Sequence, residues 1–246
     1  MTARRIVLAV LGIALVAFVG AAAWLVWPQA TLPEAEAALA STPAVAFEDA
    51  GSWLAYEPTG VDATVGIVLY PGAKVTAEAY APTARAIAEQ GFAAYVVRLP
   101  LNLAFLSPGA AESVRTAEPR IRTWALWGHS LGGAMAGQHA AEQPGAYASI
   151  AFCGSYPNGD LSGQPMIATS IYGTLDGGLE RITSDETRGQ LPASTTFVPI
   201  EGGNHEGCGW YTGQLGDPPA EISREEQQRR VVEATVAMLR QLGGQR

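Results

Sequence analysis

A serine stands between glycines where an apolar stretch meets a run of small residues, in Trp127-Gly128-His129-Ser130-Leu131-Gly132-Gly133. Residues 123–127 predict a short buried strand, and residues 130–143, which are rich in alanine and glycine, predict a helix that ends before Pro144. The pattern G-x-S-x-G at such a junction is typical of a nucleophile elbow, in which a sharp turn holds the serine hydroxyl clear of the backbone. The alternative is an ordinary strand-to-helix turn with a capping serine. The junction therefore predicts Ser130 as a nucleophile.

Stretches typical of strands and of helices alternate along the rest of the chain. Strands are expected at 45–47, 53–56, 65–70, 92–97, 148–152, 166–172 and 195–200, and helices at 76–90, 110–118, 178–188 and 222–242. The first two strands are expected to form an antiparallel hairpin. The alternation predicts an α/β fold with a mostly parallel, doubly wound sheet flanked by helices. The connection between residues 152 and 166 is too short for a large lid domain, so the site is expected to be relatively open.

The first 27 residues differ in kind from the rest. Ile6–Trp27 is an uncharged run of 22 residues that follows two arginines. Because about 20 apolar residues suffice to cross a bilayer, residues 1–27 are expected to form a transmembrane signal anchor in the cell membrane, with the remaining chain outside the cytoplasm. The alternative is a signal peptide, cleaved near Ala21-Ala22-Ala23, that releases a secreted protein.

The rest of the chain divides into a linker and one domain. Residues 28–43 contain prolines, alanines and glutamates with little hydrophobic patterning, and they are interpreted as a linker that is helical in part. Residues 44–246 are long enough for one α/β domain with a substantial core. The net charge of the chain is −8, and it becomes −10 without the two arginines of residues 1–27. This acidity disfavours nucleic acid as a partner and disfavours docking on anionic lipid through a basic face.

A serine nucleophile needs a base, and the chain has three histidines. His205 lies in a glycine-rich loop just after the last expected strand, where α/β folds place reactive groups. His129 lies inside the elbow, and His139 lies in the following helix. The sequence therefore predicts His205 as the general base.

The base in turn needs an acid that orients its ring. Asp176 directly follows the strand expected at 166–172, whereas Asp160 lies in a polar turn and Asp185 on an exposed helix. Asp176 is the preferred candidate by position. The resulting order of serine, aspartate and histidine along the chain is one of the known triad orders.

Two backbone N–H groups are expected to stabilise a developing oxyanion. One belongs to Leu131, at the start of the elbow helix, and the other is expected from Ala73 in the loop after the strand at 65–70. Lys74 lies beside Ala73, and Trp210 and Tyr211 follow the histidine loop. These three residues are candidates for the substrate pocket. A solvated lysine is the simpler interpretation of Lys74, and the two aromatics fit surface positions of the core equally well.

The chain has two cysteines, Cys153 and Cys208, and their spacing matches no metal motif and no C-x-x-C redox pair. Both are expected on the same rim of the sheet. In an oxidising compartment a disulfide between them, which would hold the histidine loop, is one hypothesis, and two free thiols are the alternative.

Several motifs in one order resemble the bacterial "α/β-hydrolase fold-5" group. They are Y-P-G-A-K-V at 70–75, R-L-P-L-N-L-A-F at 98–105, G-H-S-L-G-G at 128–133, I-Y-G-T-L-D-G at 171–177, E-G-G-N-H at 201–205 and I-S-R-E-E-Q-Q at 222–228. The resemblance covers the chain from Val65 to the C-terminus. It implies an α/β-hydrolase fold, a triad of Ser130, Asp176 and His205, and an oxyanion loop at Pro71-Gly72-Ala73. The chain departs from the group's pattern at Cys208.

These residues together predict a serine hydrolase that cleaves carboxylic esters of small molecules through an acyl-enzyme, without a metal or an organic cofactor. A thioesterase, a lactonase or an acyltransferase would use the same triad. The alternative from a different class is a binding protein that kept the fold without turnover. The natural substrate, its acyl chain and the oligomeric state do not follow from the sequence.

Overall fold

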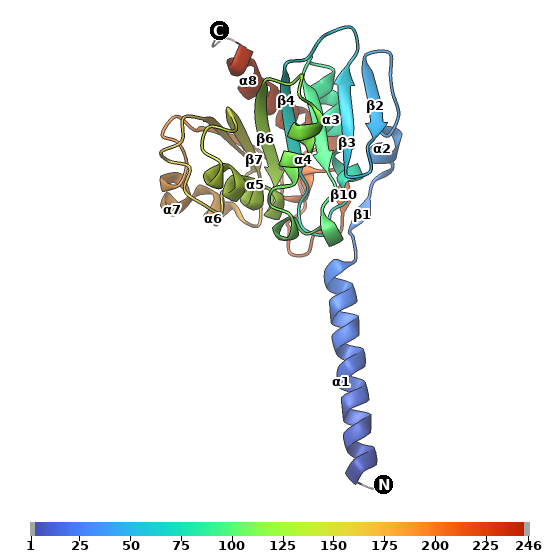
Figure 1. The fold of residues 1–246 in the computed structure, drawn as a ribbon. Coiled ribbons are helices and arrows are strands. Elements are labelled where there is room, and N and C mark those ends of the chain that lie inside the picture. Colours follow the sequence, from blue (N-terminus) through green and yellow to red (C-terminus); the bar gives the residue numbers. More distant parts are fainter. Residues whose placement is uncertain (1–2, 244–246) are drawn as a thin grey trace.

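The computed structural model describes residues 3–243, so the first two residues of the predicted anchor and the last three of the predicted domain lie outside the described residues. Helix α1 (Ala3–Val26) projects from the domain with no other element beside it (Figure 1). Among the described residues, no helix combines the length and the apolar character that are needed to cross a membrane. The expectation of a transmembrane segment is therefore not supported.

An eight-stranded sheet forms the centre of the domain, in the order β2-β3-β5-β4-β6-β7-β8-β9. Strand β3 is antiparallel to both its neighbours, and the strands from β5 to β9 in this order are parallel. The mostly parallel sheet and the N-terminal hairpin are thus as predicted. The strands are β2 (Val45–Asp49), β3 (Trp53–Pro58), β4 (Val65–Tyr70), β5 (Ala93–Val97), β6 (Thr123–His129), β7 (Ser149–Cys153), β8 (Ile167–Gly173) and β9 (Thr196–Ile200).

Helices cover both faces of this sheet (Figure 1). The α-helices of the domain around it are α3 (Ala81–Ala88), α4 (Ala110–Ala117), α5 (Leu131–Glu142), α6 (Leu179–Thr183), α7 (Asp185–Gly189) and α8 (Arg224–Gly243). Short 3₁₀ helices lie in the loops: η1 (Ala77–Tyr80), η2 (Pro100–Asn102), η3 (Ala104–Leu106) and η4 (Glu206–Cys208). The single helix expected at 178–188 is two helices. The cause is Ser184, whose backbone is extended and whose hydroxyl accepts the N–H of Thr187 and so begins a new helix.

The core has two layers because side chains alternate across each strand. On β4, Ile67 and Leu69 join a cluster with residues of α3 and α8, whereas Val68 and Tyr70 join a second cluster with residues of α4 and α5. Both faces of the parallel strands are therefore covered, which explains why β4 is apolar throughout.

Residues 28–43, expected to be a linker, pack on the domain. Strand β1 (Ala30–Thr31) pairs with β10 (Tyr211–Thr212), and α2 (Pro33–Ala37) buries Ala35 completely. The segment has too few apolar residues to show a pattern, and β1 pairs with a strand about 180 residues further along the chain.

The predicted site residues gather because parallel strands end at the same edge of the sheet. Ala73, Ser130, Asp176 and His205 each follow the carboxyl end of a different strand, namely β4, β6, β8 and β9. In open α/β sheets this edge is where ligands bind.

The elbow depends on glycine at position 132. A Cβ there would lie 2.3 Å from the carbonyl oxygens of both Tyr70 and Pro71. An alanine in place of a helical glycine ordinarily stabilises by up to about 1 kcal/mol. We expect Gly132→Ala instead to lower the free energy of unfolding by about 1–3 kcal/mol, measured by urea denaturation.

Gly163→Ala is the matched control, because a Cβ at Gly163 would meet nothing within 4 Å. If Gly132→Ala and Gly163→Ala have the same free energy of unfolding, α5 does not approach the loop after β4 as closely as described.

Candidate active site

Ser130 occupies the turn between β6 and α5. Its backbone has φ of 52° and ψ of −126°, a combination that residues other than glycine rarely adopt. Such strain persists only where the surrounding structure imposes it, and it is common at catalytic sites. The structure therefore places Ser130 in the sharp strand-to-helix turn that the sequence predicts.

Two close contacts hold this turn. A Cβ on Gly128 would lie 2.3 Å from Cα of Gly133, so β6 and α5 meet without side chains between them. The hydroxyl of Ser155 donates a hydrogen bond of 2.6 Å to the carbonyl oxygen of Ser130. Sequence reasoning missed Ser155, because a serine in a loop after a strand carries no motif.

His205 and Asp176 form a hydrogen-bonded pair. Nδ1 of His205 lies 2.9 Å from Oδ2 and 3.1 Å from Oδ1 of Asp176, and the side chain of Asp176 is fully buried. The N–H of Gly178 donates to Oδ1 of the same carboxylate at 2.7 Å. By contrast, Asp160 and Asp185, the other candidates for the acid, are exposed. Asp176 is thus the aspartate that the fold brings to His205.

The backbone of Gly154, which directly follows β7, packs closely against this pair. A Cβ on Gly154 would lie 2.8 Å from Oδ2 of Asp176 and 3.0 Å from Nδ1 of His205. Gly154 also has φ of +54°, which favours glycine. Sequence reasoning missed this position, although a glycine at the end of a central strand is a usable signal.

Asp217 supports His205 from a third loop. Its carboxylate accepts the N–H of His205 at 3.1 Å and the N–H of Glu206 at 2.7 Å. Burial lowers the pKa of His205, but the hydrogen bond and negative charge of Asp176, together with the charge of Asp217, outweigh burial and raise the pKa above 6.5. Asp217 was not predicted, because only the folded loop brings it to the histidine.

Helix α8 holds the histidine loop through two buried glutamines. The side chain of Gln227 accepts the N–H of Asn204 at 3.1 Å and donates to the carbonyl oxygen of Asn204 at 2.7 Å. The side chain of Gln228 donates to the carbonyl oxygen of Gly207 at 2.7 Å. These contacts give the motif at 222–228 a structural role.

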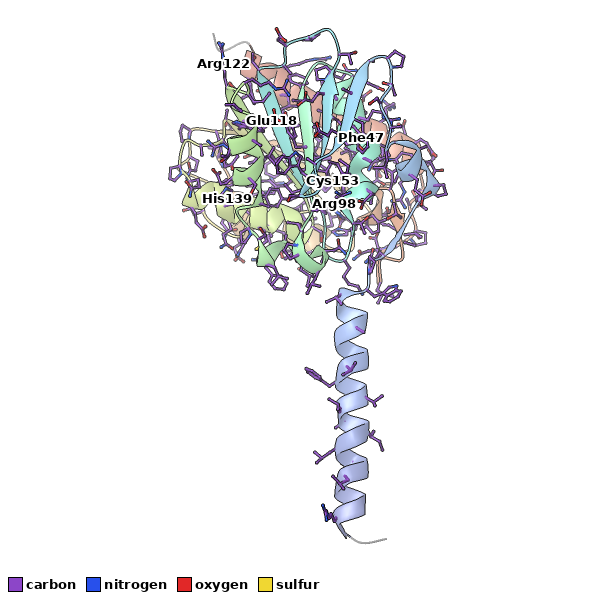
Figure 2. The ribbon with its side chains drawn as sticks, turned by 45° about the vertical axis from the view of Figure 1, so that its right-hand side comes forward. Phe47, Arg98, Glu118, Arg122, His139 and Cys153 are labelled. Atoms are coloured by element: carbon purple, nitrogen blue, oxygen red, sulfur yellow. A yellow bond between two sulfur atoms is a disulfide. The ribbon has the colours of Figure 1, made fainter. Side chains whose placement is uncertain are left out.

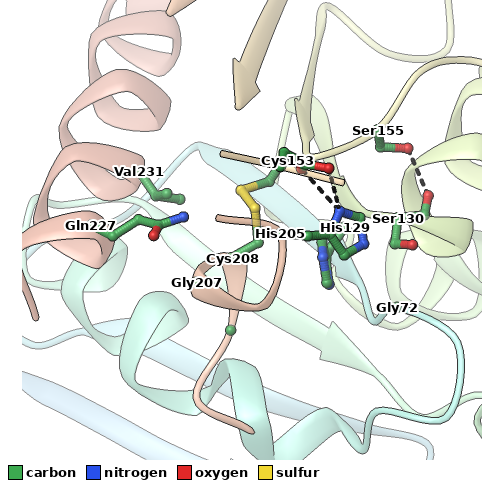
Figure 3. The surroundings of a disulfide bond; sticks show 12 residues. Gly72, His129, Ser130, Cys153, Ser155, His205, Gly207, Cys208, Gln227 and Val231 are labelled. Carbon is green, nitrogen blue, oxygen red and sulfur yellow. Dashed lines mark hydrogen bonds and ion pairs between the residues drawn. A yellow bond between two sulfur atoms is a disulfide. The ribbon is translucent and has the colours of Figure 1, made fainter. Parts of the chain in front are cut away.

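Cys153 and Cys208 form a disulfide, with their Cα atoms 6.0 Å apart. Cys153 is the last residue of β7 and Cys208 lies in η4, three residues after His205. Figure 3 shows the bridge between α8 on one side and His205 on the other. The bridge thus ties the histidine loop to the central sheet.

His129 is buried behind the site and is not the base. The N–H of Gly72 donates to the hydroxyl of Tyr80 at 2.9 Å, and that hydroxyl lies 2.7 Å from Nδ1 of His129. Burial and the neighbouring His205 lower the pKa of His129 well below 6.5, and the backbone of His205 only partly opposes this. A neutral ring that accepts the Tyr80 hydroxyl at Nδ1 carries its proton on Nε2.

His139, the third histidine, belongs to a separate polar cluster. Its Nε2 lies 3.1 Å from Oε1 of Glu112 and 3.0 Å from the hydroxyl of Tyr147. Figure 2 shows His139 and Cys153 in different parts of the domain. Within residues 3–243, no group of three His, Cys, Asp or Glu side chains is arranged to hold a metal ion.

The loop after β4 contains an N–H group without an acceptor. The N–H of Gly72 donates to Tyr80 and that of Lys74 to the carbonyl oxygen of Asn102, whereas the N–H of Ala73 has no acceptor among the described residues. Leu131 is the first residue of α5, where a backbone N–H has no partner within the helix. These are the two donors that the sequence predicts.

A cavity of about 330 Å³ opens beside Ser130, and Lys74 and Tyr211 line it as expected. The expectation for Trp210 was wrong, because this side chain lines a different groove between α3 and α8. The reason is that successive side chains of an extended chain point to opposite sides, so only one of two adjacent aromatics can face the cavity.

His205 lines an adjoining cavity of about 200 Å³, which shares Gln214 and Leu215 with the cavity of Ser130. Among the described residues, the hydroxyl of Ser130 makes no hydrogen bond to His205. In many hydrolases this hydrogen bond is long without substrate and tightens when substrate binds.

The sequence pattern of the "Alpha/beta hydrolase family" matches residues 66–229, which is more than half of the chain. The chain belongs to this family. No curated protein matches it in sequence.

Two solved structures have a similar fold. One comes from work on the metagenome-derived lipolytic enzymes LipS and LipT, with 13% identity, a TM-score of 0.55 and coverage of 74% of this chain and 95% of that one. The other is a dienelactone hydrolase from Anabaena variabilis, with 16% identity, a TM-score of 0.56 and coverage of 79% and 96%. At these identities the likeness is one of fold.

The opposite pKa shifts of the two neighbouring histidines can be measured directly. We expect His205 to titrate above pH 6.5 and His129 to stay neutral well below that pH, as followed by NMR with signals assigned from single substitutions. Asp176→Asn removes the charge and the carboxylate acceptor that favour the imidazolium, so the pKa of His205 should fall in this variant. A pKa of His205 that is unchanged by Asp176→Asn would contradict the assigned pairing.

Proposed function

We propose that the chain is a serine hydrolase that cleaves carboxylic esters through a triad of Ser130, His205 and Asp176. The observation that carries this proposal is the hydrogen-bonded pair of His205 and Asp176 at the sheet edge where the strained turn of Ser130 also lies. A histidine oriented by a buried carboxylate has its second ring nitrogen available for a hydroxyl.

The geometry suggests a role for each group. Nε2 of His205 takes the proton of Ser130 as its oxygen attacks the ester carbon, and it returns this proton to the leaving alcohol. Between these two proton transfers, the N–H groups of Ala73 and Leu131 stabilise the oxyanion of the tetrahedral intermediate. Water releases the acyl group by the same steps. Because the pKa of His205 lies above 6.5, the neutral base predominates only at pH values above that raised pKa.

The substrate bond is proposed as an ester, in keeping with the lipolytic enzymes and the dienelactone hydrolase whose folds are similar. The same groups would also serve a thioester or lactone. A binding protein without turnover would not require a strained serine beside an oriented histidine, and strain of this kind persists where it has a role.

We also propose that the domain works outside the cytoplasm. The disulfide of Cys153 and Cys208 ties the loop of the proposed base to the sheet. Disulfides of this structural kind persist in oxidising compartments and are rare in the cytosol.

Hydrolysis of p-nitrophenyl butyrate tests the proposal. We expect Ser130→Ala and His205→Ala each to lower kcat by at least about 10³-fold, because each removes a group that acts only in the reaction. Asp176→Asn should lower it by orders of magnitude as well. Ser162→Ala, at an exposed serine of the connection between β7 and β8, is the control and should retain wild-type turnover. Full activity of Ser130→Ala would overturn the assignment.

A further inference from the structure

The segment that follows α1 borders the Ser130 cavity, because Gln29 is one of the residues that line it. The N–H of Gln29 donates to the carbonyl oxygen of Lys74 at 2.8 Å, and the N–H of Leu32 donates to the carbonyl oxygen of Trp210 at 2.9 Å. Between them, β1 pairs with β10. The backbone of this segment is thus fixed between the oxyanion loop and the chain that follows His205.

This arrangement brings the side chain of Gln29 into the wall of the cavity, together with Ser130 and Ala73. Its Nε2 donates to Oε1 of Gln214 at 3.3 Å, and the hydroxyl of Tyr211 donates to the same oxygen at 3.4 Å. Because Gln214 presents its oxygen, Gln29 must present its nitrogen to Gln214. The oxygen of the Gln29 amide therefore takes no part in this hydrogen bond.

That oxygen, Oε1 of Gln29, is buried and has no hydrogen-bond partner within the described part of the chain. Buried polar groups are nearly always paired in folded proteins, and exceptions call for a functional reason.

We propose that Gln29 is a specificity-determining residue whose Oε1 accepts a hydrogen bond from a hydroxyl group of the ester substrate. The inference rests on the proposed ester hydrolysis at Ser130. A hydroxyl donates a hydrogen bond and so complements the oxygen of Gln29, whereas an alkyl group does not. The substrate class is thus an ester with a hydroxyl close to the scissile bond, on either its alcohol part or its acyl part.

Two matched pairs of esters test this assignment and distinguish the two parts. Glycerol monobutyrate and propyl butyrate differ in hydroxyls on the alcohol, and methyl 3-hydroxybutyrate and methyl butyrate differ in a hydroxyl on the acyl chain. We expect the full-length protein to prefer the hydroxylated member of one pair in kcat/KM by about tenfold to a hundredfold, because an unmatched buried acceptor penalises the other member. The pair that shows the preference identifies the part that carries the hydroxyl.

In Gln29→Met, which keeps the length of the side chain and the backbone N–H but lacks the acceptor, this preference should fall to about one. Gln143→Met, at an exposed glutamine just after α5, should keep the wild-type preference. The inference is overturned if the wild type shows no preference in either pair, or if Gln29→Met keeps it. If the wild-type protein hydrolyses the plain esters without a preference, only the role of Gln29 is overturned and the proposed function stands. If it hydrolyses none of the esters, both the role of Gln29 and the proposed function are overturned.

Discussion

The close approach of bare backbone around Ser130 is the constraint on which the site depends. Gly128 touches Gly133 across the turn, and Gly132 touches the carbonyl groups at the end of β4. A side chain at any of these positions would push α5 away from the sheet. Because the proposed oxyanion donors belong to α5 and to the loop after β4, their separation is set by this contact. The strain at Ser130 is held in place by the same packing.

The proposed base is positioned by parts of the chain that are distant in sequence. The histidine loop is bound to β7 through the disulfide, to α8 through Gln227 and Gln228, and to Asp217 through two backbone N–H groups. Loops at the edge of a sheet are otherwise mobile. Several independent tethers explain how a glycine-rich loop can hold an imidazole in a fixed orientation against Asp176.

The residues that the sequence predicted share a local signal. Ser130 has a motif at a strand-to-helix junction, and Asp176 and His205 each follow an apolar run, so periodicity alone places them at one sheet edge. Gln29 and Asp217 have no such signal, because their roles arise from contacts between segments that only the folded chain brings together. Residues 28–43 show little hydrophobic patterning, which is typical of a linker. The pairing of β1 with β10 within this segment therefore has no signal in the sequence. The error over Trp210 has a similar origin, since the side that an aromatic faces depends on the strand it joins.

The most direct test of the account is a crystal structure of the protein after reaction with an alkyl p-nitrophenyl phosphonate, which mimics the tetrahedral intermediate. The account predicts phosphorus bonded to Oγ of Ser130, a phosphonyl oxygen about 3 Å from the backbone nitrogens of Ala73 and Leu131, and Nε2 of His205 within hydrogen-bond distance of Oγ of Ser130. A phosphonate on another residue, or an oxygen that points away from both N–H groups, would contradict it.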